Sequence, residues 1–136
     1  MPVTELNHFL IIASDLERTK NFYCDVLGFE VVMNDGKPVP DNDWVCLEHG
    51  GVHVMLNTAY EREHRPAAPD PKRLAAHHDT CLYFGCPDTD AAYDYLRGKG
   101  INLKPPAVAP YGMKQLYLTD PDNYNLCFQW RAEKAV

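Results

Sequence analysis

The chain has 136 residues, of which 46% are hydrophobic and 24% charged, and its formal net charge is −6 at pH 7. This composition is typical of one globular domain and excludes a disordered chain. No apolar run approaches the roughly 20 residues that cross a bilayer, and net acidity argues against a nucleic-acid-binding surface. The five cysteines form no CxxC pair, and the N-terminus lacks the pattern of a secretion signal, so we expect a reduced, cytoplasmic protein.

The first half of the chain predicts a strand, a helix and three further strands. Residues 5–13 are apolar and β-branched, which favours a strand. The SDLE that follows has the pattern of a capping box, with Ser14 and Glu17 as its two members. Helical spacing then predicts a helix over 15–27, and Gly28 predicts a left-handed C-cap.

After this helix, FEVVMN predicts a strand, and WVCLEHGGVHVMLN predicts a β-hairpin with Gly50 and Gly51 in the tight turn. Residues 58–78 carry prolines, mixed charge and alanines, which is typical of a linker. A lid over a ligand is an alternative role for this segment.

The second half repeats this order of elements. TCLYFGC predicts a strand, PDTDAAYDYLRGKG a helix, and INLKP a short strand. KQLYLTD and NLCFQW predict a hairpin, and Asn123 in its turn predicts a positive φ. The halves align by pairing Asp15 with Asp88, Phe22 with Tyr95, and Gly28 with Gly100. We therefore predict an internal duplication, with module 1 at about 4–57, linker 58–78 and module 2 at about 79–131, within one domain over 1–136.

Both modules resemble a known superfamily. LNHFLIIASDLERTKNFYCDVLGFEVV is similar to the opening of the vicinal oxygen chelate superfamily, which contains glyoxalase I, bleomycin resistance proteins and extradiol dioxygenases. YGMKQLYLTDPDNYNLCFQW resembles its closing module. The resemblance implies an α+β fold in which two tandem βαβββ modules form a curled mixed sheet around a central cavity, in a homodimer.

The resemblance also implies four positions for a divalent metal: a His, a carboxylate, a His or Gln, and a Glu. Carried over by position, His8 matches the first, whereas Met55, Cys81 and Cys127 stand at the other three. Because carboxylate and imidazole ligands suit the metals of this family, we expect no metal cofactor. A divalent ion at His8 stays open as an alternative, and His53, on the same strand face as Met55, could join it with the two thiols.

Strand alternation then predicts an apolar and aromatic cavity lining with a few polar groups. Its predicted ligand-binding residues are His8, Leu10, His53, Met55, Cys81, Tyr83, Tyr117, Cys127 and Gln129. We expect this lining to bind a small hydrophobic or aromatic molecule without metal, as in the bleomycin-resistance-like members. The buried, apolar neighbours of Cys127 indicate pocket lining rather than a nucleophile.

Three other functions stay open from the sequence. One is a metal-dependent lyase, isomerase or extradiol dioxygenase with a rearranged site around His8. Another is a cofactor-free enzyme with His8 or His53 as general base. The third is a partner-binding module with a filled cavity. We expect no membrane and no nucleic-acid partner.

Overall fold

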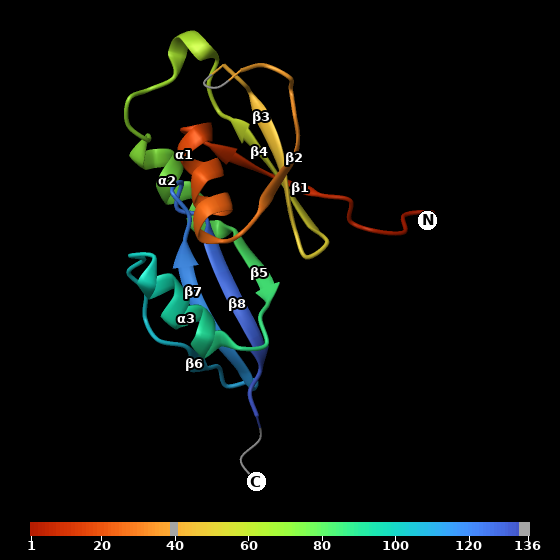
Figure 1. Cartoon of the computed structure of the whole chain (residues 1–136), viewed down its shortest axis with the longest axis vertical. Coiled ribbons are helices and arrows are strands. Elements are labelled where there is room, and N and C mark those ends of the chain that lie inside the picture. The colour runs from red at the N-terminus through yellow and green to blue at the C-terminus, as the bar shows by residue number, and fades with distance from the viewer. Residues whose placement is uncertain (39–40, 134–136) are drawn as a thin grey trace. The chain divides into compact units, whose positions relative to one another are not determined.

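The computed structural model describes residues 1–38 and 41–133 (Figure 1). The chain divides into two compact units, Met1–Arg73 and Leu74–Val136. Among the described residues, no helix has both the length and the apolar character needed to cross a membrane.

Unit 1 contains one four-stranded sheet and one principal helical segment. Its elements are β1 (Phe9–Ala13), α1 (Leu16–Asn21), the π-helical turn η1 (Phe22–Val26), β2 (Glu30–Asn34), β3 (Trp44–His49), β4 (Val52–Thr58) and η2 (Arg62–His64). The sheet order is β1-β4-β3-β2, with β1 parallel to β4 and the other pairs antiparallel. This is the predicted βαβββ order, with the predicted hairpin between β3 and β4.

Unit 2 has the same order of strands and helix. Its elements are η3 (His77–Asp79), β5 (Cys81–Gly85), α3 (Thr89–Gly98), β6 (Ala107–Val108), β7 (Met113–Thr119) and β8 (Asn125–Arg131). The boundary between the units falls within α2 (Pro71–Ala76). The sheet order β5-β8-β7-β6 is the same, strand for strand, as that of unit 1, and β5 is parallel to β8. The predicted α+β class with two βαβββ modules is therefore confirmed.

Local details support the duplication. Asp15 and Asp88 occupy the same N-cap position, each accepting a backbone N–H three residues on, at 3.0 and 2.9 Å. Gly28 and Gly100, which follow the two helices, have φ values of 81° and 83°. A side chain is strained at such angles, so glycine is the residue that ends both helices cleanly.

Two predictions of local structure were wrong. The N-cap of the first helix is Asp15 rather than Ser14, because the extended chain continues one residue further before the helix begins. The short strand predicted over INLKP does not form; the strand that pairs with β7 is Ala107–Val108. The two prolines at 105 and 106 lack the N–H that a ladder requires and delay this strand.

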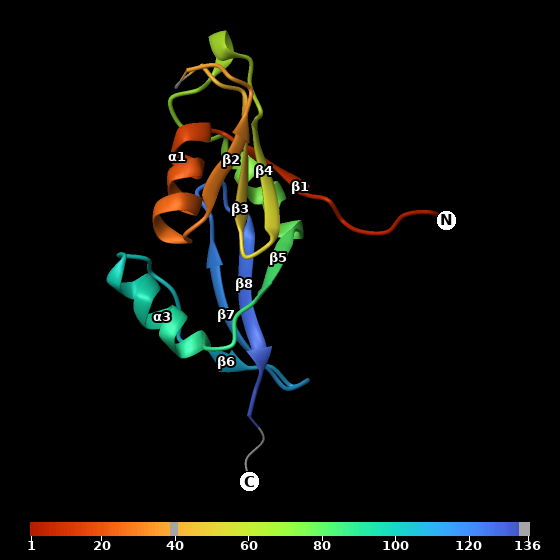
Figure 2. The same cartoon turned by 45° about the vertical axis from the view of Figure 1, so that its right-hand side comes forward.

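Each helix covers one face of its own sheet (Figure 2). In unit 1 the covered face is apolar, and its buried residues include Ile11, Ala13, Val45, Leu47, Val54 and Leu56. In unit 2, Leu96 of α3 is buried with Leu116, Leu118 and Leu126 of the sheet. The hydrophobic effect of burying these side chains fixes which strand residues face the helix, and alternation sends their neighbours to the opposite face.

Candidate ligand-binding face

The candidate site lies on the face of the unit 2 sheet that α3 does not cover. The strand register places three residues of one row together: Tyr83 of β5 is opposite Cys127 of β8, and Cys127 is opposite Tyr117 of β7. The next row on this face contains Gln129 and Gln115, which are also direct cross-strand partners. Cys81, two residues before Tyr83, lies on the same face. Five of the predicted site residues are therefore neighbours.

Tyr83 and Tyr117 flank Cys127 and are linked through their side chains. A hydrogen bond with Tyr83 is the largest of the effects that raise the pKa of the Tyr117 phenol, followed by burial and a hydrogen bond with Cys127. Tyr83 is 54% exposed and Tyr117 47%, whereas Cys127 beneath them is fully buried. The two rings thus form an open surface whose hydroxyl groups are held in place, and Cys127 is their support.

Gln115 extends this arrangement along β7. Its Nε2 donates to the Tyr111 hydroxyl at 2.8 Å and to Gln129 Oε1 at 2.9 Å, while its Oε1 accepts from the Tyr117 hydroxyl at 3.3 Å. Gln115 itself is buried. We refer to Tyr83, Tyr111, Gln115, Tyr117 and Gln129 as the tyrosine–glutamine network. Its polar atoms are oriented by one another before any ligand arrives.

The two thiols of this face are in their protonated form near neutral pH. Burial raises the pKa of Cys127 and of Cys81, more than hydrogen bonds with Tyr117 and Tyr83 lower it. A nucleophilic cysteine needs a lowered pKa and access to solvent. Neither thiol is activated in this way.

Unit 1 also has an uncovered sheet face, and three predicted residues lie on it. Leu10 of β1 is opposite Met55 of β4, and His53, two residues before Met55, is opposite Glu48 of β3. Leu10 and His53 are exposed and Met55 is half-buried. The sequence prediction that His53 and Met55 share a face agrees with this register.

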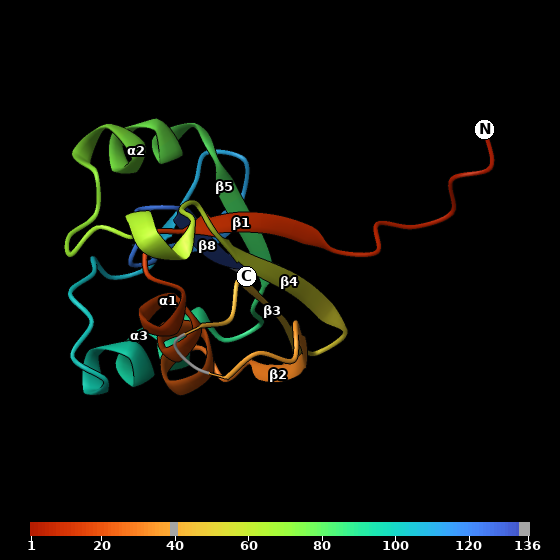
Figure 3. The same ribbon diagram turned by 90° about the horizontal axis from the view of Figure 1, so that it is seen from above.

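His8 is not part of this strand. It is the last residue of the exposed segment that precedes β1 and extends away from the sheet (Figure 3). Its ring Nδ1 lies 2.9 Å from the side-chain oxygen of Asn7. Within the part of the chain that the structure describes, no three His, Cys, Asp or Glu side chains are grouped so as to hold an ion.

Two members of the network, Gln115 and Tyr111, were missed from the sequence. Gln115 carries a usable signal, because it is two residues before Tyr117 on the same strand and so must share its face. Tyr111 lies in the turn before β7, where no periodicity applies. Its role follows only from the hydrogen bond to Gln115.

Comparison with known proteins identifies the family of this fold. The sequence model of the Glyoxalase/Bleomycin resistance protein/Dioxygenase superfamily matches residues 5–128. The chain belongs to this superfamily. The family resemblance drawn from the two modules is therefore confirmed, and so is the glyoxalase-like fold.

The chain is similar to individual proteins from several organisms. The YaeR protein of Escherichia coli (strain K12) is 30% identical over 127 residues, covering 90% of this chain and 92% of its own. The structure of a glyoxalase family protein from Enterococcus faecalis has a TM-score of 0.70 at 28% identity, covering 96% of this chain and 100% of that chain. TnmS3, an antibiotic binding protein from Streptomyces sp. CB03234, has a TM-score of 0.71 at 20% identity and covers 97% and 99%.

Proposed function

We propose that this glyoxalase-superfamily chain binds a small, uncharged aromatic or hydrophobic molecule on the uncovered face of β5, β8 and β7, without a metal. The observation that carries the proposal is the tyrosine–glutamine network. Two half-exposed aromatic rings, Tyr83 and Tyr117, stand over a buried thiol, and their hydroxyls are fixed by neighbours. Rings of this kind bind a planar ligand through apolar contact and hydrogen bonds.

The charge of this face supports an uncharged ligand. Among the described residues on it, the rows from Cys81 to Gly85 and their partners on β7 and β8 contain no acidic or basic side chain. On β8, the first charged residue beyond these rows is Arg131, two residues after Gln129. The raised pKa of Tyr117 and of both thiols keeps these groups neutral. An ionic ligand would lose its hydration without a partner of opposite charge.

The residues at the family's metal positions do not fit a hard divalent ion. Met55 offers a thioether where a carboxylate would be needed, and Cys81 and Cys127 offer thiols whose raised pKa disfavours the thiolate. The imidazole of His8 is engaged with Asn7. The side chains at these four positions therefore favour ligand binding without a metal ion. We propose no metal-dependent reaction step.

The unit 1 face extends the proposal. Leu10, Met55 and His53 present apolar surface and one imidazole, which would suit the same class of ligand. The antibiotic-binding description of TnmS3 supports a binding role for this fold. A homodimer and a cytoplasmic location stay predictions from the sequence.

The proposal is tested with xanthone, a neutral planar ketone, as the probe. We expect xanthone to raise the melting temperature of the wild type and to lose most of this effect in the double variant Tyr83→Phe/Tyr117→Phe. Tyr95→Phe is the matched control, because Tyr95 on α3 is 51% exposed and lies outside the face. A ligand screen in which the double variant responds as the wild type does would contradict the proposal.

Metal content is measured on the same preparations. We expect elemental analysis of the freshly purified protein to find no stoichiometric first-row metal. A metal present at one equivalent, and removed by a chelator together with an enzymatic activity, would instead support the metal-dependent alternative.

A further inference from the structure

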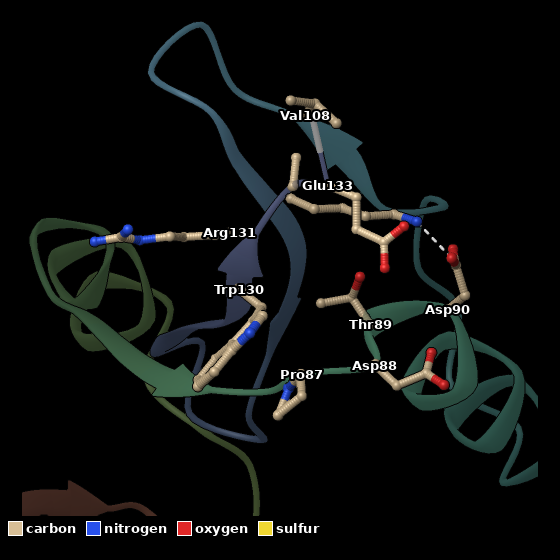
Figure 4. Close-up of a pocket in the computed structure, with 10 residues that line it drawn as sticks. Pro87, Asp88, Thr89, Asp90, Val108, Trp130, Arg131 and Glu133 are labelled. Carbon is tan, nitrogen blue, oxygen red and sulfur yellow. Dashed lines mark hydrogen bonds and ion pairs between the residues drawn. The ribbon is translucent and has the colours of Figure 1, made fainter. Parts of the chain in front are cut away.

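Unit 2 contains a pocket that is lined by none of the residues of the tyrosine–glutamine network. This pocket of about 540 Å³ lies where the end of β8 meets the start of α3 (Figure 4). This volume is within the range of roughly 300–1,000 Å³ that is usual for small-molecule sites. None of the nine predicted site residues lines it.

A row of side chains across three strands forms the floor of the pocket. Val108 of β6 is opposite Lys114 of β7, and Lys114 is opposite Trp130 of β8. The Trp130 ring extends over β5, where a Cβ added to Gly85 would lie 3.3 Å from the ring carbon ζ3. Glycine at 85 therefore makes room for the ring, which is 49% exposed.

The first turn of α3 and the chain after β8 form the walls. Asp88, Thr89 and Asp90 line one side, and Glu133 lines the other. The backbone N–H of Ala132 donates to the Gly112 carbonyl at 2.9 Å, which fixes the chain at this point. Figure 4 shows Glu133 extending toward Thr89, whereas Arg131 extends away from the other labelled side chains.

Among the described residues, the charges that face this pocket are mainly negative. Lys114 forms an ion pair with Asp90, so these two charges largely cancel. The guanidinium of Arg131 extends away from the other labelled side chains of the pocket. The carboxylates of Asp88 and Glu133 remain, and Asp88 uses one oxygen to cap α3. Negative charge beside an exposed indole face attracts cations, and it opposes an anion at the start of the helix.

We propose that this pocket binds a small molecule that carries an organic ammonium group on an apolar or aromatic body. The ammonium group lies beside the face of Trp130 on the side of the Glu133 carboxylate, and the Asp88 carboxylate lies at the edge of the pocket near the start of α3 (Figure 4). The apolar body contacts Val108 and Pro87. This site differs in charge preference from the uncovered sheet face, so one chain would bind two chemically distinct ligands.

The test uses the full chain and follows the indole N–H signals of its two tryptophans, Trp44 and Trp130, by NMR. Phenethylammonium is the cationic probe and phenylacetate is its anionic counterpart. We expect phenethylammonium to shift the Trp130 signal saturably, to leave the Trp44 signal in place, and to bind at least about fivefold more tightly than phenylacetate. Equal responses to the two probes, or no shift of the Trp130 signal, would overturn the proposal.

Two variants separate charge from structure. Glu133→Gln removes one carboxylate, and Asp88→Ser removes the other while it keeps an oxygen that can cap α3. Each is expected to weaken phenethylammonium binding roughly threefold to tenfold. Asp94→Asn is the matched control, because Asp94 is an exposed carboxylate of α3 that does not line the pocket. Wild-type affinity in both pocket variants would contradict the proposal, whatever the result with xanthone.

Discussion

Tyr83 and Tyr117 lie in one cross-strand row on either side of Cys127, and the interaction of their side chains is the largest cause of the raised pKa of the Tyr117 phenol. This relationship spans the three strands that form the uncovered face of unit 2. It makes the two rings one surface rather than two independent side chains.

The first prediction concerns the pH dependence of the Tyr117 phenol. Because its hydrogen bond with Tyr83 raises its pKa above the ordinary value of 10.0, the phenol stays protonated in the folded chain at a pH where the unfolded chain ionises. Its contribution to the free energy of unfolding is therefore full below pH 10.0 and is lost as the pH rises toward the folded-state pKa.

Denaturant unfolding at a series of pH values measures this effect. Above about pH 10 the wild type should lose stability more steeply than Tyr117→Phe, which has no phenol to ionise. Parallel curves for the two proteins would show that folding does not raise the pKa of the Tyr117 phenol.

The second prediction concerns Cys127, which fills space beneath the two rings. Cys127→Ala should lower the free energy of unfolding by about 1 kcal/mol, because a small buried group is lost. It should leave xanthone binding within about twofold, since the apolar and aromatic contacts remain. Calorimetric titration with xanthone measures the affinity of the variant. If Cys127→Ala abolished a catalytic activity of the wild type, the role of Cys127 as a support for the two rings would be contradicted.

The third prediction concerns the turn between β7 and β8. Asn123 has a φ of 68°, and its Nδ2 donates to the Leu74 carbonyl at 3.3 Å and lies 3.0 Å from His78 Nε2. Asn123→Gly should cost about 1 kcal/mol through the lost hydrogen bonds. Asn123→Ala should cost about 1 kcal/mol more, because alanine is strained in the left-handed region.

Urea unfolding of the two variants measures this difference. The test depends on which variant has the lower free energy of unfolding. We expect Asn123→Ala to be less stable than Asn123→Gly. The reverse order would mean that the left-handed backbone at 123 is not retained in solution.

The fourth prediction uses the duplication. Asp15→Ala and Asp88→Ala each remove an N-cap acceptor and should each lower the free energy of unfolding by about 1 kcal/mol. Asp15→Asn keeps the acceptor and should cost less than half of that. Thermal unfolding compares them with Asp25→Ala, a control at an exposed position of the first helical segment. A full loss in Asp15→Asn would assign the effect to charge rather than to capping.

The sequence was sufficient for the parts of the fold that depend on local chemistry. Gly28 and Asn123 were predicted to have positive φ, and they do, because few residues tolerate that region. Strand alternation correctly placed Tyr83 with Tyr117 and Cys127, since a period of two leaves no choice once one face is buried.

Other features depend on a choice between neighbouring residues of similar propensity, or on contacts between distant segments of the chain. Ser14 and Asp15 are both good N-cap residues, and the backbone decides between them, because Asp15 still has extended angles of φ −124° and ψ 103°. The pocket beside Trp130 was missed altogether, because it requires a β5 glycine, a β8 tryptophan and the start of α3 to meet in space. The prediction that His8 lines the cavity is not tested, and the structure places this residue before β1.

The most direct test of the account is an NMR titration of ring-labelled tyrosine with xanthone, with each signal assigned by a Tyr-to-Phe variant. We predict that the signals of Tyr83 and Tyr117 shift together and saturate at one xanthone per chain, while the signal of Tyr95 on α3 stays in place. Saturable shifts confined to tyrosines outside the tyrosine–glutamine network, or shifts that require an added divalent metal, would contradict it.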